Sequence, residues 1–139
     1  MSLATYAWGY GAALLTVGVL DGLWLGLIAR EFYRSQMAAV IADNFNLIPA
    51  VLFYFLYPLG VLFVALTPPP QGWAEALGRS ALLGLVAYGV YDLTNMATLK
   101  AWPVKLALVD VTWGTFITAM AGLAAYSAMA WATAPGASR

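Results

Sequence analysis

The sequence contains no cysteine and no histidine. Their absence excludes disulfides, thiol chemistry, metal sites built from thiolate or imidazole, haem ligation by either residue type, and catalytic triads that use histidine. Only carboxylates and other oxygen groups remain as metal ligands. We therefore predict no metal site and no cofactor.

Charged residues are also scarce, at 9% of the chain against about 25% in a typical soluble domain. Six Lys and Arg balance six Asp and Glu, so the chain lacks the basic surface that binds nucleic acid. In contrast, 63% of the residues are hydrophobic. This composition indicates a membrane protein with membrane lipids as partners and no nucleic-acid partner.

Four apolar segments reach the roughly 20 residues that a helix needs to cross the hydrocarbon core. They are residues 5–29, 47–66, 77–99 and 104–131. The predicted fold is all-α, a single membrane domain over residues 1–139 that forms an antiparallel bundle of four transmembrane helices. In the first connection, residues 31–43 mix apolar and charged side chains, which is typical either of an amphipathic interfacial helix or of an ordinary loop.

The basic residues indicate the orientation of the chain. Connections one and three lie on the same side and carry Arg30, Arg34, Lys100 and Lys105, whereas the other side has Arg79 and Arg139. The positive-inside rule makes the first side cytoplasmic. Both termini are then expected in the periplasm, with the protein a multi-pass component of a bacterial inner membrane.

Three aspartates, Asp21, Asp92 and Asp110, fall inside the apolar segments. A carboxyl group in hydrocarbon costs several kcal/mol unless it is paired, protonated or hydrated, so such residues usually face the interior of a bundle. Counting residues from the basic ends places all three in the cytoplasmic half of the bilayer. By this count Asp21 and Asp92 lie at matched depth, and Asp110 is shallower.

Aromatic and polar neighbours accompany these acids. Trp24 and Trp113 each follow an aspartate by three residues, which puts ring and carboxyl on adjoining turns of one helix. The ligand-binding residues predicted from this pattern are Asp21, Trp24, Tyr54, Tyr57, Tyr91, Asp92, Asn95, Lys100, Asp110 and Trp113. Catalytic residues are not assigned.

Each feature also has a purely structural interpretation. Asp21 and Asp92 can form a buried polar clasp with Asn95 and a snorkelling Lys100, and Asp110 can pair with a lysine near the surface. Gly18, Gly22 and Gly26 form a ladder beside Asp21, and Gly114, Thr118 and Gly122 form a second one. Small residues at this spacing let a neighbouring helix approach closely, so both ladders are predicted to be packing faces.

Four strings resemble those of a bacterial membrane-protein family of unknown function, domain of unknown function 2177. They are Asp21-Gly22-Leu23-Trp24-Leu25-Gly26, Tyr91-Asp92-Leu93-Thr94-Asn95, Lys100-Ala101-Trp102-Pro103 and Asp110-Val111-Thr112-Trp113-Gly114. The resemblance covers nearly the whole chain. It implies an inner-membrane location and four spans, and it implies no reaction.

Three functions remain open at this point. The leading hypothesis is a protein that binds or transports a small amphipathic or lipid-like molecule, with proton coupling through the carboxyls. The first alternative is an intramembrane enzyme of lipid or isoprenoid metabolism, in which Asp92 and Asp110 act as general acid and base or as oxygen ligands for a divalent ion. The second is an accessory subunit of a larger membrane complex. A homodimer and an association with another membrane protein both remain open.

Overall fold

The computed structural model describes residues 1–134, and this part of the chain is helical, with no strand. The elements in order are α1 (Leu3–Leu23), η1 (Trp24–Ile28), α2 (Arg30–Gln36), α3 (Leu47–Gly60), η2 (Val61–Ala65), α4 (Trp73–Thr98) and α5 (Val104–Thr133). The all-α class predicted from the sequence is confirmed. Arg139, which entered the orientation count, lies outside the described residues.

Local sequence signals begin and end these helices. The side chains of Ser2 and Asn46 accept hydrogen bonds from backbone N–H groups at the starts of α1 and α3, which satisfies donors that have no partner within the helix. The π-helical segments η1 and η2 continue α1 and α3 directly. The helix α2 ends at Gln36, so it is shorter than the predicted segment 31–43.

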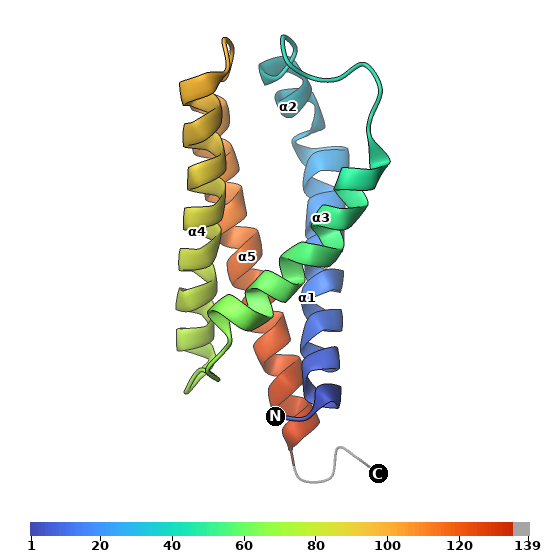
Figure 1. Ribbon diagram of the computed structural model, residues 1–139, viewed down its shortest axis with the longest axis vertical. Helices are drawn as coiled ribbons and strands as arrows, with labels where there is room; N and C mark the ends of the chain where they lie inside the picture. The colour runs from blue at the N-terminus through green and yellow to red at the C-terminus, as the bar shows by residue number, and fades with distance from the viewer. Residues whose placement is uncertain (135–139) are drawn as a thin grey trace.

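The helices pack unevenly around α5. The pair α4 and α5 forms an antiparallel hairpin, α1 lies against α5, and α3 crosses obliquely in front of them (Figure 1). The helix α3 packs on α1, while η2 at its end reaches α1, α4 and α5. The buried core sits where these elements meet and includes Val17, Leu62, Ile117 and Ala121.

Glycines allow the close approach of α4 and α5. A Cβ atom on Gly114 would clash with the ring of Tyr88, and one on Gly122 would clash with Ser80. These two residues therefore lie at a packing face, as expected for small residues at this spacing.

The predicted packing ladder on helix one is wrong. A Cβ atom added to Gly18, Gly22 or Gly26 would meet nothing within 4 Å, so this stripe faces away from the other helices. The buried face of α1 is instead formed by small or polar residues four apart: Thr5, Gly9, Ala13, Val17 and Asp21. Helix α1 is thus turned so that Asp21 still faces inward.

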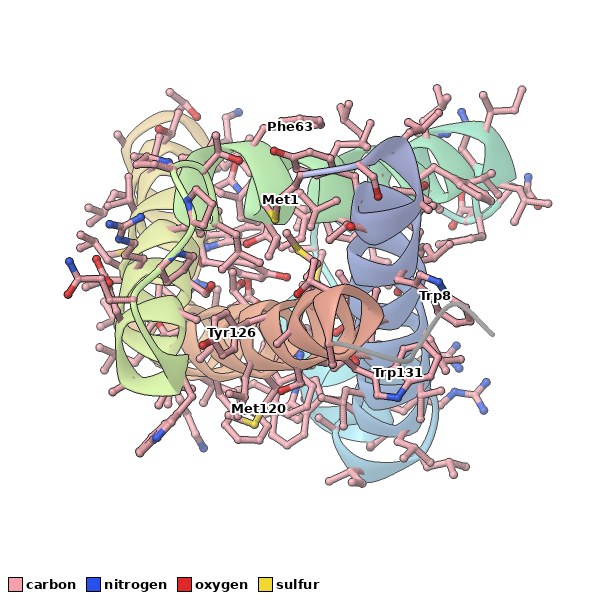
Figure 2. All side chains as sticks on the ribbon, turned by 90° about the horizontal axis from the view of Figure 1, so that it is seen from below. Met1, Trp8, Phe63, Met120, Tyr126 and Trp131 are labelled. Atoms are coloured by element: carbon pink, nitrogen blue, oxygen red, sulfur yellow. The ribbon has the colours of Figure 1, made fainter. Side chains whose placement is uncertain are left out.

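Among residues 1–134, three helical segments are long and apolar enough to cross a membrane: Leu3–Ile28, Leu47–Ala65 and Val104–Thr133. The helix α4 has 26 residues but is less apolar than the other long helices. At the end where α1 begins and α5 ends, Trp8 and Trp131 pack edge to face with ring centroids 5.3 Å apart (Figure 2). Tryptophans gathered at the ends of apolar helices are typical of membrane interfaces.

Candidate functional site

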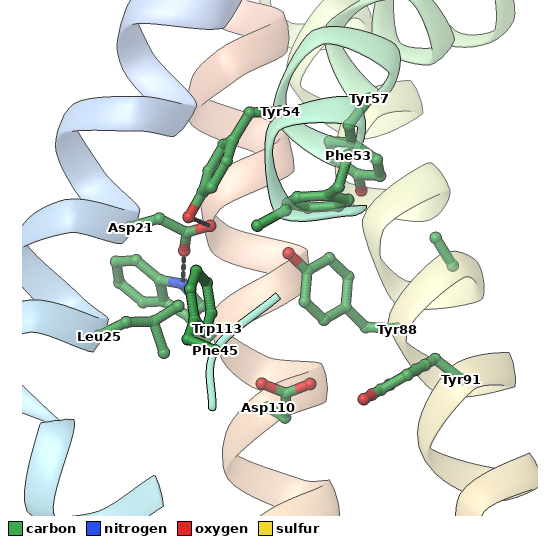
Figure 3. A pocket seen from close by; sticks show the side chains of 12 residues that line it. Asp21, Leu25, Phe45, Phe53, Tyr54, Tyr57, Tyr88, Tyr91, Asp110 and Trp113 are labelled. Atoms are coloured by element: carbon green, nitrogen blue, oxygen red, sulfur yellow. Dashed lines mark hydrogen bonds between the residues drawn. The ribbon is translucent and has the colours of Figure 1, made fainter. Parts of the chain in front are cut away.

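A cavity of about 460 Å³ opens among the helices near the α2 end of the molecule (Figure 3). Residues from α1, η1, α3, α4, α5 and the segment before α3 contribute to it. The lining residues are Asp21, Leu25, Phe45, Ala50, Phe53, Tyr54, Tyr57, Ala87, Tyr88, Tyr91, Asp110 and Trp113. Its volume falls in the range of pockets that hold small organic ligands, about 300 to 1,000 Å³.

Asp21 forms one wall of the cavity, and its side chain is 4% exposed. The Trp113 indole Nε1–H donates to its Oδ1 at 2.8 Å, and the Tyr54 hydroxyl donates to its Oδ2 at 3.3 Å. Figure 3 shows both hydrogen bonds. Each oxygen thus has one donor, which fixes the orientation of the carboxyl group, and each keeps a lone pair for a further contact.

In the two Asp-x-x-Trp elements, 21–24 and 110–113, the tryptophan of each element is hydrogen-bonded toward the aspartate of the other element. Trp113 bonds Asp21 of the other helix rather than Asp110 of its own. Trp24 donates to the Tyr33 hydroxyl at 3.3 Å, and that hydroxyl donates to Asp110 Oδ1 at 2.6 Å. The rings of Trp24 and Trp113 stack against each other. Each indole thus bonds a residue of another helix, although an acid of its own helix lies on the adjoining turn.

Asp92 is fully buried, and its main partners are not those expected. The Trp102 indole donates to Asp92 Oδ1 at 2.9 Å, and the Asp92 carboxyl interacts with that of Asp110. Oδ2 of Asp92 has no hydrogen bond of good geometry within the described residues. The acids that lie together are therefore Asp92 and Asp110, at one level of the α4–α5 hairpin, whereas Asp21 occupies a separate position beside Trp113.

Tyrosines border the space between Asp21 and Asp110. The Tyr57 hydroxyl donates to Thr118 Oγ1 at 2.7 Å, because the Thr118 hydroxyl itself donates to the Gly114 carbonyl. The hydroxyl of Tyr88 points into the cavity between the two acids (Figure 3). The close packing of Tyr88 on Gly114 sets the position of this ring.

The structure brings most of the predicted residues to the cavity and leaves four outside its lining. Asp21, Tyr54, Tyr57, Tyr91, Asp110 and Trp113 line it, whereas Trp24, Asp92, Asn95 and Lys100 do not. Trp24 and Asp92 remain linked to the site through Tyr33 and Asp110. Lys100 is exposed, and Asn95 lies beside Tyr91 on α4.

Several residues at the site were missed at the sequence level. Tyr33, Tyr88 and Trp102 bond or neighbour the acids, and Phe45 and Phe53 line the cavity. Tyr88 could have been found, because it lies one turn before Asp92 on the same polar face of its helix. Tyr33 and Phe45 gave no such signal, since they belong to the first connection, whose path the sequence does not define.

The charges around the cavity are all of one sign. None of the twelve lining residues is a lysine or arginine. Lys105 lies over the ring of Phe32, 5.7 Å from its centroid, rather than beside Asp110. In the part of the chain that the structure describes, the salt bridge present joins Arg79 to Glu75. The acids at the site are thus satisfied by indole and phenol donors instead of cations.

Tyr33, in the connection, acts as a donor to Asp110. Burial raises the pKa of the Tyr33 hydroxyl above its ordinary value of 10.0, and the hydrogen bond to Asp110 raises it further. Tyr33 therefore keeps its proton at neutral pH.

The site offers hydrogen-bond donors, carboxyl groups and aromatic faces. Within the described residues no group of three Asp or Glu side chains comes together to hold a metal ion.

Fold and site together define an all-helical membrane protein with an acidic, aromatic cavity between its helices. The chain belongs to the family described as "Predicted membrane protein (DUF2177)", whose model matches residues 6–127. No curated protein and no solved structure matches the chain significantly.

Proposed function

We propose that this protein binds a small amphipathic or lipid-like molecule within the bilayer and carries it between the membrane and one of its faces. The observation that supports the proposal best is the cavity of about 460 Å³, which has aromatic walls and two carboxyl groups. Apolar pockets with a few convergent polar groups are the usual form of small-molecule sites.

The proposal includes four membrane spans, with α4 as the fourth. Its 26 residues correspond to about 39 Å, enough to cross a hydrocarbon core of about 30 Å. Two of its polar residues, Ser80 and Asp92, are buried, and the exposed surface along its middle is largely apolar. That surface includes Leu82, Leu85, Val86, Val90 and Leu93. Such a helix fits a lipid environment despite its lower average hydropathy.

We place the cavity in the cytoplasmic half of a bacterial inner membrane, with both termini periplasmic. The basis is the location of Arg30, Arg34, Lys100 and Lys105 at the α2 end of the helices, near the cavity. The rim residues Phe45 and Tyr91 are exposed and aromatic. These exposed rings support entry of an amphipathic ligand from the surrounding lipid as part of the proposal.

Proton exchange is part of the proposal. Asp92 is buried and faces Asp110, which lines the cavity, and two adjacent carboxylates would repel each other strongly in hydrocarbon. A single proton shared between them removes this repulsion. The Tyr33 hydroxyl at Asp110 connects the pair to the first connection.

The test is native mass spectrometry of protein extracted in a mild detergent, combined with a variant that fills the cavity. We expect a bound small amphiphile in the wild type and its loss in Ala87→Phe, since Ala87 lines the cavity. Ala97→Phe is the matched control, because Ala97 is exposed on the same helix away from the lining. Retention of the molecule in Ala87→Phe, or protein free of any small molecule, would contradict the proposal.

A further inference from the structure

The lining of the cavity selects for one sign of charge. Two of its twelve residues are acids and none is basic. The four basic residues at this end of the molecule, Arg30, Arg34, Lys100 and Lys105, are all exposed outside it. An anionic ligand would be repelled by both carboxyl groups in a medium of low dielectric, where the repulsion is weakly screened.

Aromatic rings dominate the rest of the surface. Two Phe, four Tyr and one Trp make up seven of the twelve lining residues. The face of an aromatic ring carries partial negative charge and attracts a cation, most strongly where water is excluded. The rings and the carboxyls therefore favour the same charge on a ligand.

The Asp21 carboxyl is positioned to contact a cationic group of a ligand. Its two hydrogen bonds, from Trp113 and Tyr54, come from neutral donors, and among residues 1–134 no cation forms a salt bridge with this carboxyl. The Tyr88 hydroxyl, which points into the cavity, adds a lone pair between Asp21 and Asp110 (Figure 3). An ammonium group with an apolar body can contact both a carboxyl group and an aromatic ring of this lining.

We propose that the ligand is an organic cation, an amine or quaternary ammonium with an apolar body, whose charged group lies between Asp21 and Asp110. This inference rests on the proposed function, because it names the ligand class of the same cavity.

The experiment compares three amphiphiles with the same chain and different charge: decyltrimethylammonium, 1-decanol and decyl sulfate. Radiolabelled forms are equilibrated by dialysis with protein in nanodiscs of zwitterionic lipid, and empty nanodiscs give the background. We expect the cation to bind at least about tenfold more tightly than the alcohol, a difference of roughly 1.4 kcal/mol, and the anion to bind most weakly.

Variants then assign the preference to the site. Asp21→Asn and Asp110→Asn should each weaken cation binding about tenfold or more while leaving the alcohol unchanged. Asp43→Asn, at an exposed acid outside the cavity, is the matched control and should bind like the wild type. Circular dichroism and size-exclusion elution establish that each variant is folded, and the comparison of the three amphiphiles on wild-type protein holds even where a variant does not fold.

The possible results separate the two proposals. Equal binding of all three amphiphiles, blocked by Ala87→Phe, would overturn the cation inference and leave the binding function in place. Preference for decyl sulfate would also overturn it. Binding no greater than to empty nanodiscs for all three would contradict the proposed function and the inference with it.

Discussion

The indole rings of Trp24 and Trp113 stack with their centroids 4.4 Å apart and their planes 8° from parallel. Each ring belongs to a different helix, and each donates its N–H toward an acid on the opposite one, directly for Trp113 and through Tyr33 for Trp24. The stack therefore fixes the position of α1 against α5 and holds Asp21 at the wall of the cavity.

Removal of the indole donor at Trp113 should destabilise the fold more than removal at Trp24. Trp113→Phe deprives the buried Asp21 carboxyl of a hydrogen bond of 2.8 Å, a loss of about 1 to 3 kcal/mol. Both variants keep an aromatic ring in the stack. Trp24→Phe loses only the longer hydrogen bond of 3.3 Å to the Tyr33 hydroxyl, so its loss of stability should be smaller. Unfolding in mixed detergent micelles measures both, and equal losses would contradict the assignment of Trp113 to Asp21.

Glycine substitutions should distinguish the two ladders. Gly114→Ala places a methyl group against the Tyr88 ring and should cost about 1 to 3 kcal/mol through overpacking. Gly22→Ala adds the same group in open space and should be neutral or stabilising by up to about 1 kcal/mol, because alanine favours the helix. Thermal unfolding of the two variants in detergent provides the comparison, and a destabilised Gly22→Ala would restore the first ladder as a packing face.

The Tyr33 hydroxyl should contribute stability that disappears at alkaline pH. Its pKa is raised in the folded protein by burial and by Asp110, so the folded state holds this proton more tightly than the unfolded state. The contribution is complete below the ordinary value of 10.0 and decreases as pH rises above it. Tyr33→Phe should be less stable than wild type at pH 8 and lose less stability between about pH 10 and 11. Parallel curves of unfolding against pH would rule out this role.

A proton shared by Asp92 and Asp110 should be visible in the infrared spectrum without any ligand. A protonated carboxyl absorbs apart from the carboxylate bands, and this absorption should weaken in both Asp92→Asn and Asp110→Asn at neutral pH. Asp43→Asn should leave it unchanged, since that residue is exposed. A spectrum with no protonated carboxyl would remove proton coupling from the proposed function.

The orientation is open to direct labelling, because a chain without cysteine allows single cysteines to be placed cleanly. Ser35 and Gln71 are both exposed in connections on opposite sides. In intact cells, an impermeant thiol reagent should label Gln71→Cys from the periplasm and leave Ser35→Cys unlabelled until the membrane is opened. The reverse pattern would move the cavity to the periplasmic half.

The positions of three long helical segments could be predicted from the sequence because their apolar length defines them. The helix α4 is less apolar, and it begins at Trp73, before the predicted segment 77–99. The buried face of α1 was harder to predict. This helix has two stripes of small residues, one through Gly18 and Gly22 and one through Gly9 and Ala13. Only the second leads at a spacing of four residues to Asp21, and this relation would have identified the buried face.

The partners of the acids could not be read from local spacing. The interval of three residues between Asp21 and Trp24 is a contact within one helix, whereas the folded chain satisfies Asp21 from α5. Tyr33 reaches Asp110 across 77 residues of sequence. Such a contact depends on the path of the chain through η1 and α2, which positions Tyr33. No motif in the first connection defines this path.

The hydrogen bonds that join α1 to α5 predict which residues change together among related sequences. A slide of one helix along the other by a single turn, about 5.4 Å, would break the bond of Trp113 to Asp21 and the relay from Trp24 to Asp110 together. Among relatives, replacement of Trp113 should therefore be accompanied by replacement of Asp21, its neighbour in space, more often than of Asp110, its neighbour in sequence. The two short elements are therefore expected to change together in evolution, although more than 80 residues of chain separate them.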